Sequence, residues 1–119
     1  MSDWKQLDAE LDQAILSGKA LEAFEKFYAD NVVMIEGSGE KFEGKQVNRK
    51  REEEFFASVE AFHGASVGAK GYGDNVSLAE WVFDVTFKGA GRVKMEQVVV
   101  RTWKDGQVVR ERFYYHGDH

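Results

Sequence analysis

Cysteine and proline are both absent from the 119 residues of this sequence. Without cysteine the chain can form neither a disulfide nor a thiolate metal site, which suits a reducing compartment. Without proline, the turns between helices and strands have to rely on glycine, and there are twelve glycines. A chain of this length buries enough surface to fold without a disulfide or other cross-link. We therefore expect a single domain spanning residues 1–119.

A surplus of positive charge and a long apolar run are also missing. The formal net charge is −5, which excludes the basic surface that a nucleic-acid-binding protein needs to neutralise phosphates. No apolar stretch approaches the roughly 20 residues of a membrane span, and the polar start does not resemble a signal peptide. We expect a cytoplasmic protein whose partners include neither nucleic acid nor membrane.

Aromatic residues are plentiful, with nine Phe, four Tyr and three Trp, and their spacing predicts an α+β fold. Apolar residues recur at helical spacing in three stretches, 3–17, 19–29 and 45–61. Alternation and glycine turns predict strands at 31–36, 41–43, 63–72, 76–88, 92–104 and 107–116. Helices followed by an antiparallel meander predict three N-terminal helices packed on a curved, mostly antiparallel sheet.

Strand alternation also assigns an inner face. The side chains that we expect to point inward are Trp81, Phe83, Val85 and Phe87, then Met95, Gln97, Val99 and Arg101, and finally Val109, Glu111, Phe113 and Tyr115. Met34 and Glu36 share one face of the strand 31–36. This arrangement turns Glu36, Gln97 and Glu111 toward a surface that otherwise consists of rings and aliphatic side chains.

Two interpretations of these carboxylates remain open. Burial raises the pKa of a carboxyl group, which makes it a usable general acid or base near neutral pH. Alternatively, each glutamate pairs with an arginine, because an unpaired buried charge costs several kcal/mol. The candidate partners are Arg49, Arg101 and Arg112.

Both ends of the chain resemble a known family. Residues 23–39, with Phe27-Tyr28-Ala29-Asp30 before a strand, and the closing hairpin at 101–115 resemble SnoaL-like proteins of the nuclear-transport-factor-2-like superfamily. The resemblance implies a cone-shaped fold with a pocket for a small, largely apolar or polycyclic molecule, and a homodimer joined through the outer sheet face. The superfamily includes polyketide cyclases, ketosteroid isomerases, hydrolases and non-catalytic domains.

The resemblance carries roles over to particular residues. Glu36 falls where ketosteroid isomerases keep a catalytic carboxylate, but the places of their oxyanion-binding tyrosine and acid hold Leu11 and Val99. That specific activity is therefore excluded, since oxyanion stabilisation is usually the largest catalytic contribution. SnoaL-type cyclases use an acidic residue deep in the pocket for proton transfer, and the resemblance suggests Glu111 as a candidate for that part.

These observations lead to two hypotheses. In the first, Glu36 and Glu111 transfer protons without a cofactor, Tyr28 and Gln97 orient a ligand oxygen, and an apolar wall consists of Met34, Trp81, Phe83, Phe113 and Tyr115. In the second, the cone is filled by its own rings and serves as a non-catalytic module, whose outer face pairs with another copy through Val82, Val98, Val100, Arg112 and Tyr114.

The charged run and the histidines give less indication of a functional site. The charged run 48–54 is typical of a solvated helix face, although Arg49 could instead reach the pocket mouth and bind an anion. His63, His116 and His119 lack metal-ligand spacing, so we predict no metal site and no cofactor.

Overall fold

The computed structural model describes residues 3–115, so the predictions for His116 and His119 lie outside the described residues. The helices are α1 (Trp4–Leu16), α2 (Ala20–Phe27) and α3 (Lys45–Ala57). The strands are β1 (Tyr28–Ile35), β2 (Lys41–Glu43), β3 (Val59–Gly73), β4 (Val76–Phe87), β5 (Gly91–Lys104) and β6 (Gln107–Tyr114). No helix within this part of the chain is long and apolar enough to cross a membrane.

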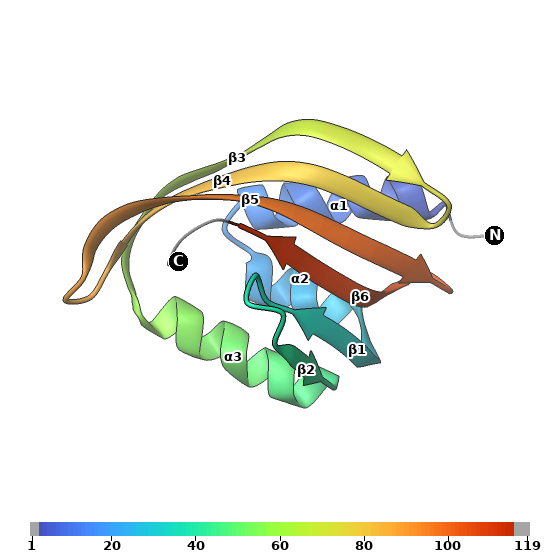
Figure 1. Ribbon diagram of the computed structural model, residues 1–119, viewed down its shortest axis with the longest axis horizontal. Helices are drawn as coiled ribbons and strands as arrows, with labels where there is room; N and C mark the ends of the chain where they lie inside the picture. The colour runs from blue at the N-terminus through green and yellow to red at the C-terminus, as the bar shows by residue number, and fades with distance from the viewer. Residues whose placement is uncertain (1–2, 116–119) are drawn as a thin grey trace.

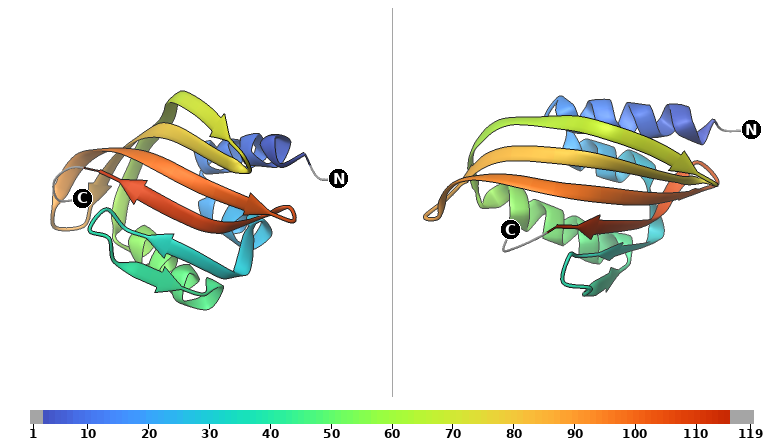
Figure 2. Two further views of the ribbon diagram at one scale, coloured as in Figure 1. Left: turned by 45° about the vertical axis from the view of Figure 1, so that its right-hand side comes forward. Right: turned by 45° about the horizontal axis from the view of Figure 1, so that its top comes forward.

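All six strands form one mixed sheet in the order β2-β1-β6-β5-β4-β3. Every neighbouring pair is antiparallel except β1 with β6, which is parallel. The long strands β3, β4 and β5 arch over the helices, and the three helices lie on the concave side (Figures 1 and 2). The predicted α+β class, with three helices on a strongly curved and mostly antiparallel sheet, is confirmed.

Local sequence signals account for several element ends. The Asp3 carboxylate accepts hydrogen bonds from the backbone N–H groups of Lys5 and Gln6, which caps the free donors at the start of α1. Asp105 and Gly106 both have positive φ, at 53° and 77°. That pair of angles is what a two-residue hairpin turn requires, and it joins β5 to β6 as the sequence predicts.

Two helix ends differ from the prediction because sheet pairing competes with helical propensity. Tyr28 leaves α2 and begins β1, where it pairs with Val108 of β6. α3 ends at Ala57 rather than at residue 61, since the chain from Val59 onward pairs with β4. Both changes lengthen strands at the expense of helices.

A bulge corrects one predicted side-chain direction. Thr102 pairs with Arg110 and Trp103 with Val108, so Val109 is the extra residue between them. Val108 therefore points inward and is fully buried, whereas Val109 is only partly buried. The inward assignment of Val109 was wrong, but the alternation from Glu111 onward is unaffected.

The core lies between the helices and the inner face of the sheet. One buried cluster joins both N-terminal helices to β1, β5 and β6, and its members are Leu11, Ala23, Phe24, Phe27, Tyr28, Val32, Met34, Trp103 and Val108. A second cluster on β4 and β5 consists of Ala79, Trp81 and Val99. Burial of this apolar surface is the main favourable contribution to folding.

Candidate active site

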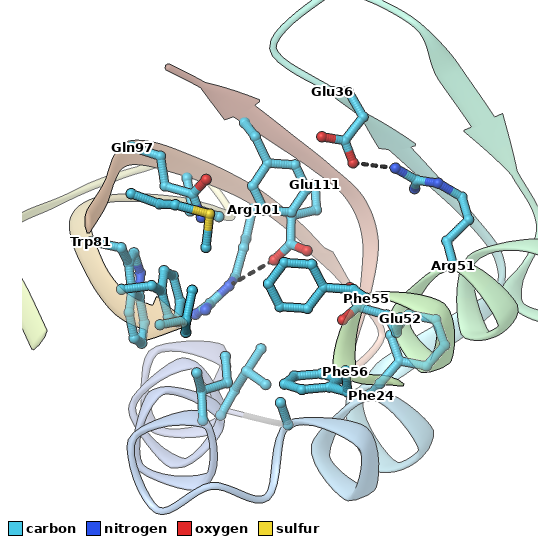
Figure 3. A pocket seen from close by; sticks show the side chains of 18 of the residues that line it. Phe24, Glu36, Arg51, Glu52, Phe55, Phe56, Trp81, Gln97, Arg101 and Glu111 are labelled. Carbon is cyan, nitrogen blue, oxygen red and sulfur yellow. Dashed lines mark hydrogen bonds and ion pairs between the residues drawn. The ribbon is translucent and has the colours of Figure 1, made fainter. Parts of the chain in front are cut away.

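A cavity of about 510 Å³ lies between the sheet and the three helices. Nine aromatic side chains line it, namely Phe24, Tyr28, Phe55, Phe56, Phe62, Trp81, Phe83, Phe113 and Tyr115. Its charged lining residues are Glu36, Arg51, Glu52, Arg101 and Glu111 (Figure 3). The interior of the cone is therefore partly open, and its apolar wall carries a small number of ionisable groups.

Glu111 is held from two sides at the floor of this cavity. The Tyr28 hydroxyl donates to its Oε2 at 2.6 Å, and Nε of Arg101 donates to the same oxygen at 3.1 Å. Burial raises the pKa of Glu111 above its usual value, and Arg101 and Tyr28 offset only part of that effect. Of the candidate arginines, Arg101 is thus the one that pairs with Glu111.

Behind Arg101 lies a buried ionic network that reaches α1. Nη1 of Arg101 contacts Oδ1 of Asp12 at 2.6 Å and Oδ1 of Asp8 at 3.3 Å. Lys70 of β3 also pairs with both aspartates. Burial favours loss of the Arg101 proton, but the surrounding anions raise its pKa, so the guanidinium stays charged.

Asp8 has several polar partners in this network, and Lys70 forms an ion pair with its Oδ2. Its Oδ1 accepts hydrogen bonds from Ser77 Oγ and from Trp103 Nε1, each at 2.8 Å. Burial alone would raise the pKa of Asp8, but Arg101, Lys70 and these two donors together lower it. Asp8 therefore remains ionised inside the protein and anchors α1 to the sheet.

Glu36 occupies a second side of the cavity, where it pairs with Arg51 of α3. The Tyr115 hydroxyl donates to its Oε2 at 3.2 Å, and the Arg51 guanidinium lies 3.6 Å from the centre of the Phe42 ring. The partner of Glu36 is thus Arg51. Arg49, which we considered for the pocket mouth, instead forms ion pairs with two exposed glutamates.

Glu52 differs from the other two glutamates of the cavity because no donor among residues 3–115 holds its carboxylate. It lines the cavity beside Phe55 and Phe56 of the same helix and faces Phe24 of α2 (Figure 3). Burial, followed by the negative charge of Glu111, raises the pKa of Glu52 to about 7, while Arg51 acts in the opposite direction. Glu52 can therefore gain or lose a proton near neutral pH.

Metal-ligating geometry is not found in the part of the chain that the structure describes. No group of three or more His, Asp or Glu side chains between residues 3 and 115 could hold a metal ion. His63 lies on the sheet, where its Nε2 is 2.8 Å from Oγ1 of Thr86. Four of the ionisable groups of the cavity form ion pairs with one another, Glu36 with Arg51 and Glu111 with Arg101.

Comparison with known proteins identifies the family. The model of the SnoaL-like domain matches residues 5–115. The chain belongs to the SnoaL-like family. A search of curated proteins gives no significant match.

Solved structures agree with this assignment. A candidate SnoaL-like polyketide cyclase from Mesorhizobium loti superimposes with a TM-score of 0.86 at 28% identity, covering 97% of this chain and 100% of the other. A cystatin-like protein of unknown function from Xanthomonas campestris gives 0.82 at 12% identity, covering 98% and 92%. A second candidate SnoaL-like cyclase, from Jannaschia, gives 0.79 at 13%, covering 96% and 88%.

In this SnoaL-like domain, the cavity brings together most of the side chains that the sequence assigned to the site. Those that line it are Tyr28, Glu36, Trp81, Phe83, Gln97, Glu111, Phe113 and Tyr115. Met34 does not line it, which corrects the prediction. The Met34 side chain is fully buried and belongs to the core cluster that includes Phe24 and Leu11. Leu11 and Val99 both line the cavity as apolar side chains.

Sequence analysis missed the groups that α1 and α3 contribute to the SnoaL-like site. Asp8 and Asp12 were overlooked because acidic residues are usually exposed, yet Asp8 follows Trp4 by four residues and so lies on the apolar face of α1. Glu52 was read as part of a solvated run. The available signal was that Phe55 and Phe56, three and four residues later, share its helix face.

Proposed function

We propose that this protein binds a small, largely apolar molecule in the cavity and transfers a proton to or from it without a cofactor. The observation that carries the proposal is the Glu52 carboxylate, which borders the cavity without a donor among residues 3–115 and whose pKa is raised to about 7 by burial and the negative charge of Glu111. A general acid or base works best when its pKa lies near the operating pH. Glu52 meets this condition better than an exposed glutamate does.

The open interior is the reason to prefer ligand binding over a filled, non-catalytic cone. A cavity of about 510 Å³ falls within the usual range of roughly 300–1,000 Å³ for small-molecule sites. The Trp81 and Phe83 rings stack with their centres 5.4 Å apart and an interplanar angle of 5°. Because the two rings stack on each other, they form a rigid aromatic wall that offers its remaining faces and edges to an apolar ligand body.

The three glutamates of the cavity take different roles in this proposal. Glu52 exchanges the proton. Glu111 is the second proton-handling group, and its bonds to Tyr28 and Arg101 fix its position. Glu36 holds Arg51 in place by an ion pair, and the negative charges of Glu111 and Glu36 help to raise the pKa of Glu52. Gln97 remains available to orient a ligand oxygen.

This arrangement supports isomerisation, cyclisation or hydrolysis by general acid–base catalysis. Each of these reactions begins with removal or addition of a proton at a carbon or oxygen atom of the substrate. The likeness to the Mesorhizobium loti cyclase candidate, which extends over that whole chain, fits such a reaction. Fold alone does not select among these reactions, since unrelated chemistries share one fold.

The test uses 5-nitrobenzisoxazole, whose ring opens when a carboxylate base removes the proton on its carbon atom. The proton moves to the carboxylate as the N–O bond breaks, and the released phenolate is coloured. We expect the wild type to accelerate this reaction, with kcat/KM rising with pH through an apparent pKa near 7. The variant Glu52→Gln should lose this activity.

The matched control is Glu54→Gln, which removes the same charge from an exposed position on the same helix. It should retain both the rate and the pH profile of the wild type. If Glu52→Gln turned over the substrate at the wild-type rate, or kept the pH profile of the wild type, the assignment of Glu52 as the proton-transfer group would be overturned.

A further inference from the structure

The charges around the cavity do not balance. Three carboxylates line it, from Glu36, Glu52 and Glu111, against two guanidinium groups, from Arg51 and Arg101. The network behind Arg101 does not correct this surplus, because it adds two aspartates and only one cation, Lys70. The cavity therefore has a negative potential when all of these groups are ionised.

The surplus negative charge falls on Glu52. Glu36 is paired with Arg51, and Glu111 is held by Arg101 and Tyr28. Glu52 has neither a hydrogen bond nor an ion pair within residues 3–115, although its side chain reaches a partly buried, ring-lined space. A carboxylate in such a place is poorly solvated, and it gains free energy from any positive charge that enters.

The surroundings of Glu52 also suit a cation. Phe24, Phe55 and Phe56 lie next to Glu52 in the cavity wall (Figure 3). Phe55 meets Phe56 edge to face, with ring centres 5.2 Å apart, so the two rings present different surfaces toward the space around them. Aromatic faces attract ammonium groups through the ring quadrupole, and rings beside a carboxylate are a recurrent way of binding amines.

We propose that the ligand of this cavity is an amine, with a positively charged nitrogen beside Glu52 and an apolar body against Trp81 and Phe83. The inference rests on the proposed function only in that the ligand occupies the same cavity. The ammonium N–H can pass its proton to the Glu52 carboxylate and take it back, with no other reactant.

The other charge classes fit the cavity less well. An anionic ligand would need Arg51 or Arg101, and carboxylates already engage both guanidinium groups. A neutral ligand would leave the Glu52 charge unpaired, or would require Glu52 to remain protonated. The groups that act on the charge of Glu52 are Glu36 directly after β1, Tyr28 on β1, Glu111 on β6 and Arg51 on α3 itself. Two of these four are carboxylates and one is a cation.

The test compares three probes that share one rigid apolar cage: 1-adamantylamine, 1-adamantanol and 1-adamantanecarboxylate. Calorimetry on the full chain at pH 8 should show the amine binding about tenfold or more tightly than the alcohol, with the carboxylate weakest. Near pH 6.5 the amine should release protons on binding, and titrations in two buffers of different ionisation enthalpy measure that release.

The variant Glu52→Gln should remove the advantage of the amine over the alcohol and abolish the proton release. Glu54→Gln, with the same loss of charge on the exposed side of α3, should preserve both. Circular dichroism of each variant establishes that the fold is intact before the affinities are compared.

Other results of the binding experiments would contradict the inference. Equal affinity for amine and alcohol, or failure of all three probes to bind, overturns the amine inference. The proposed proton transfer still stands in that case if 5-nitrobenzisoxazole is opened by the wild type and not by Glu52→Gln. An amine preference that persists in Glu52→Gln overturns the placement of the nitrogen beside Glu52.

Discussion

The Tyr28 hydroxyl donates a 2.6 Å hydrogen bond to Oε2 of Glu111, across 83 positions of sequence. Tyr28 is the first residue of β1, and Glu111 lies on the inner face of β6, the strand that runs parallel to β1. Both side chains are nearly inaccessible to solvent. The bond therefore joins the two halves of the chain at the floor of the cavity.

Removing this hydroxyl should destabilise the protein. In Tyr28→Phe, a buried carboxylate oxygen loses one of its two donors, which costs about 1–3 kcal/mol. Urea unfolding measures the difference. Tyr72→Phe is the matched control, because Tyr72 is 48% exposed and this substitution should change the free energy of unfolding by less than about 0.5 kcal/mol. Equal losses in the two variants would show that the Tyr28 bond contributes nothing specific.

Arg101→Met should cost more, about 3–5 kcal/mol of unfolding free energy. The substitution keeps most of the side-chain volume but leaves Asp8, Asp12 and Glu111 without their common cation. The pair of Arg92 with Asp84 provides the comparison, since Arg92 is exposed and Arg92→Met should cost far less than Arg101→Met. Denaturant titration of both variants at pH 7 checks the contrast, and similar losses would contradict it.

Glu52 should make the stability of the protein depend on pH. Its pKa rises from 4.5 to about 7 on folding, so the unfolded chain ionises first. Below pH 4.5 the carboxyl group is protonated in both states and costs nothing. Between pH 4.5 and 7 the unfolded chain loses this proton while the folded state keeps it, so the free energy of unfolding falls by about 1–3 kcal/mol and levels off above pH 7.

Glu52→Gln should therefore be more stable than the wild type at pH 8 and should match it near pH 4.5. Urea titrations at several pH values would show the wild-type curve falling toward pH 8 relative to that of the variant. A constant difference between the two proteins over this range would mean that Glu52 does not titrate with a raised pKa. A functional group that lowers stability is common in active sites.

The outer face of the sheet leads to a prediction about assembly. Leu78 and Tyr114 are 42% and 47% exposed, and strand register places Leu78 beside Val100, which in turn pairs with Arg112. We propose that this face joins two copies of the chain. Light scattering during gel filtration should then give twice the mass of one chain for the wild type and a single-chain mass for Leu78→Lys.

The control for this assembly is Gln13→Lys, which adds the same charge on the exposed side of α1. It should leave the mass unchanged. A wild-type mass equal to that of one chain at all accessible concentrations would refute the proposed pairing.

The sequence by itself determined the order of the elements and most of the inner face. Period-two alternation is a local property, so Trp81, Phe83 and Glu111 could be assigned to one side of the sheet before any contact was known. The Asp105-Gly106 turn could be placed for the same reason, because its backbone angles depend on those two residues.

Only the tertiary structure decided which charges meet. Arg101 could have paired with any nearby carboxylate, and it contacts Asp8 and Asp12 because α1 packs on the inner side of the curved sheet (Figure 1). Glu52 looked solvated in the sequence, since a charged run on a helix is usually exposed. Its place in the cavity depends on how α3 packs against the curved sheet. Many contacts between residues distant in sequence set that packing, so the residues around Glu52 do not determine it.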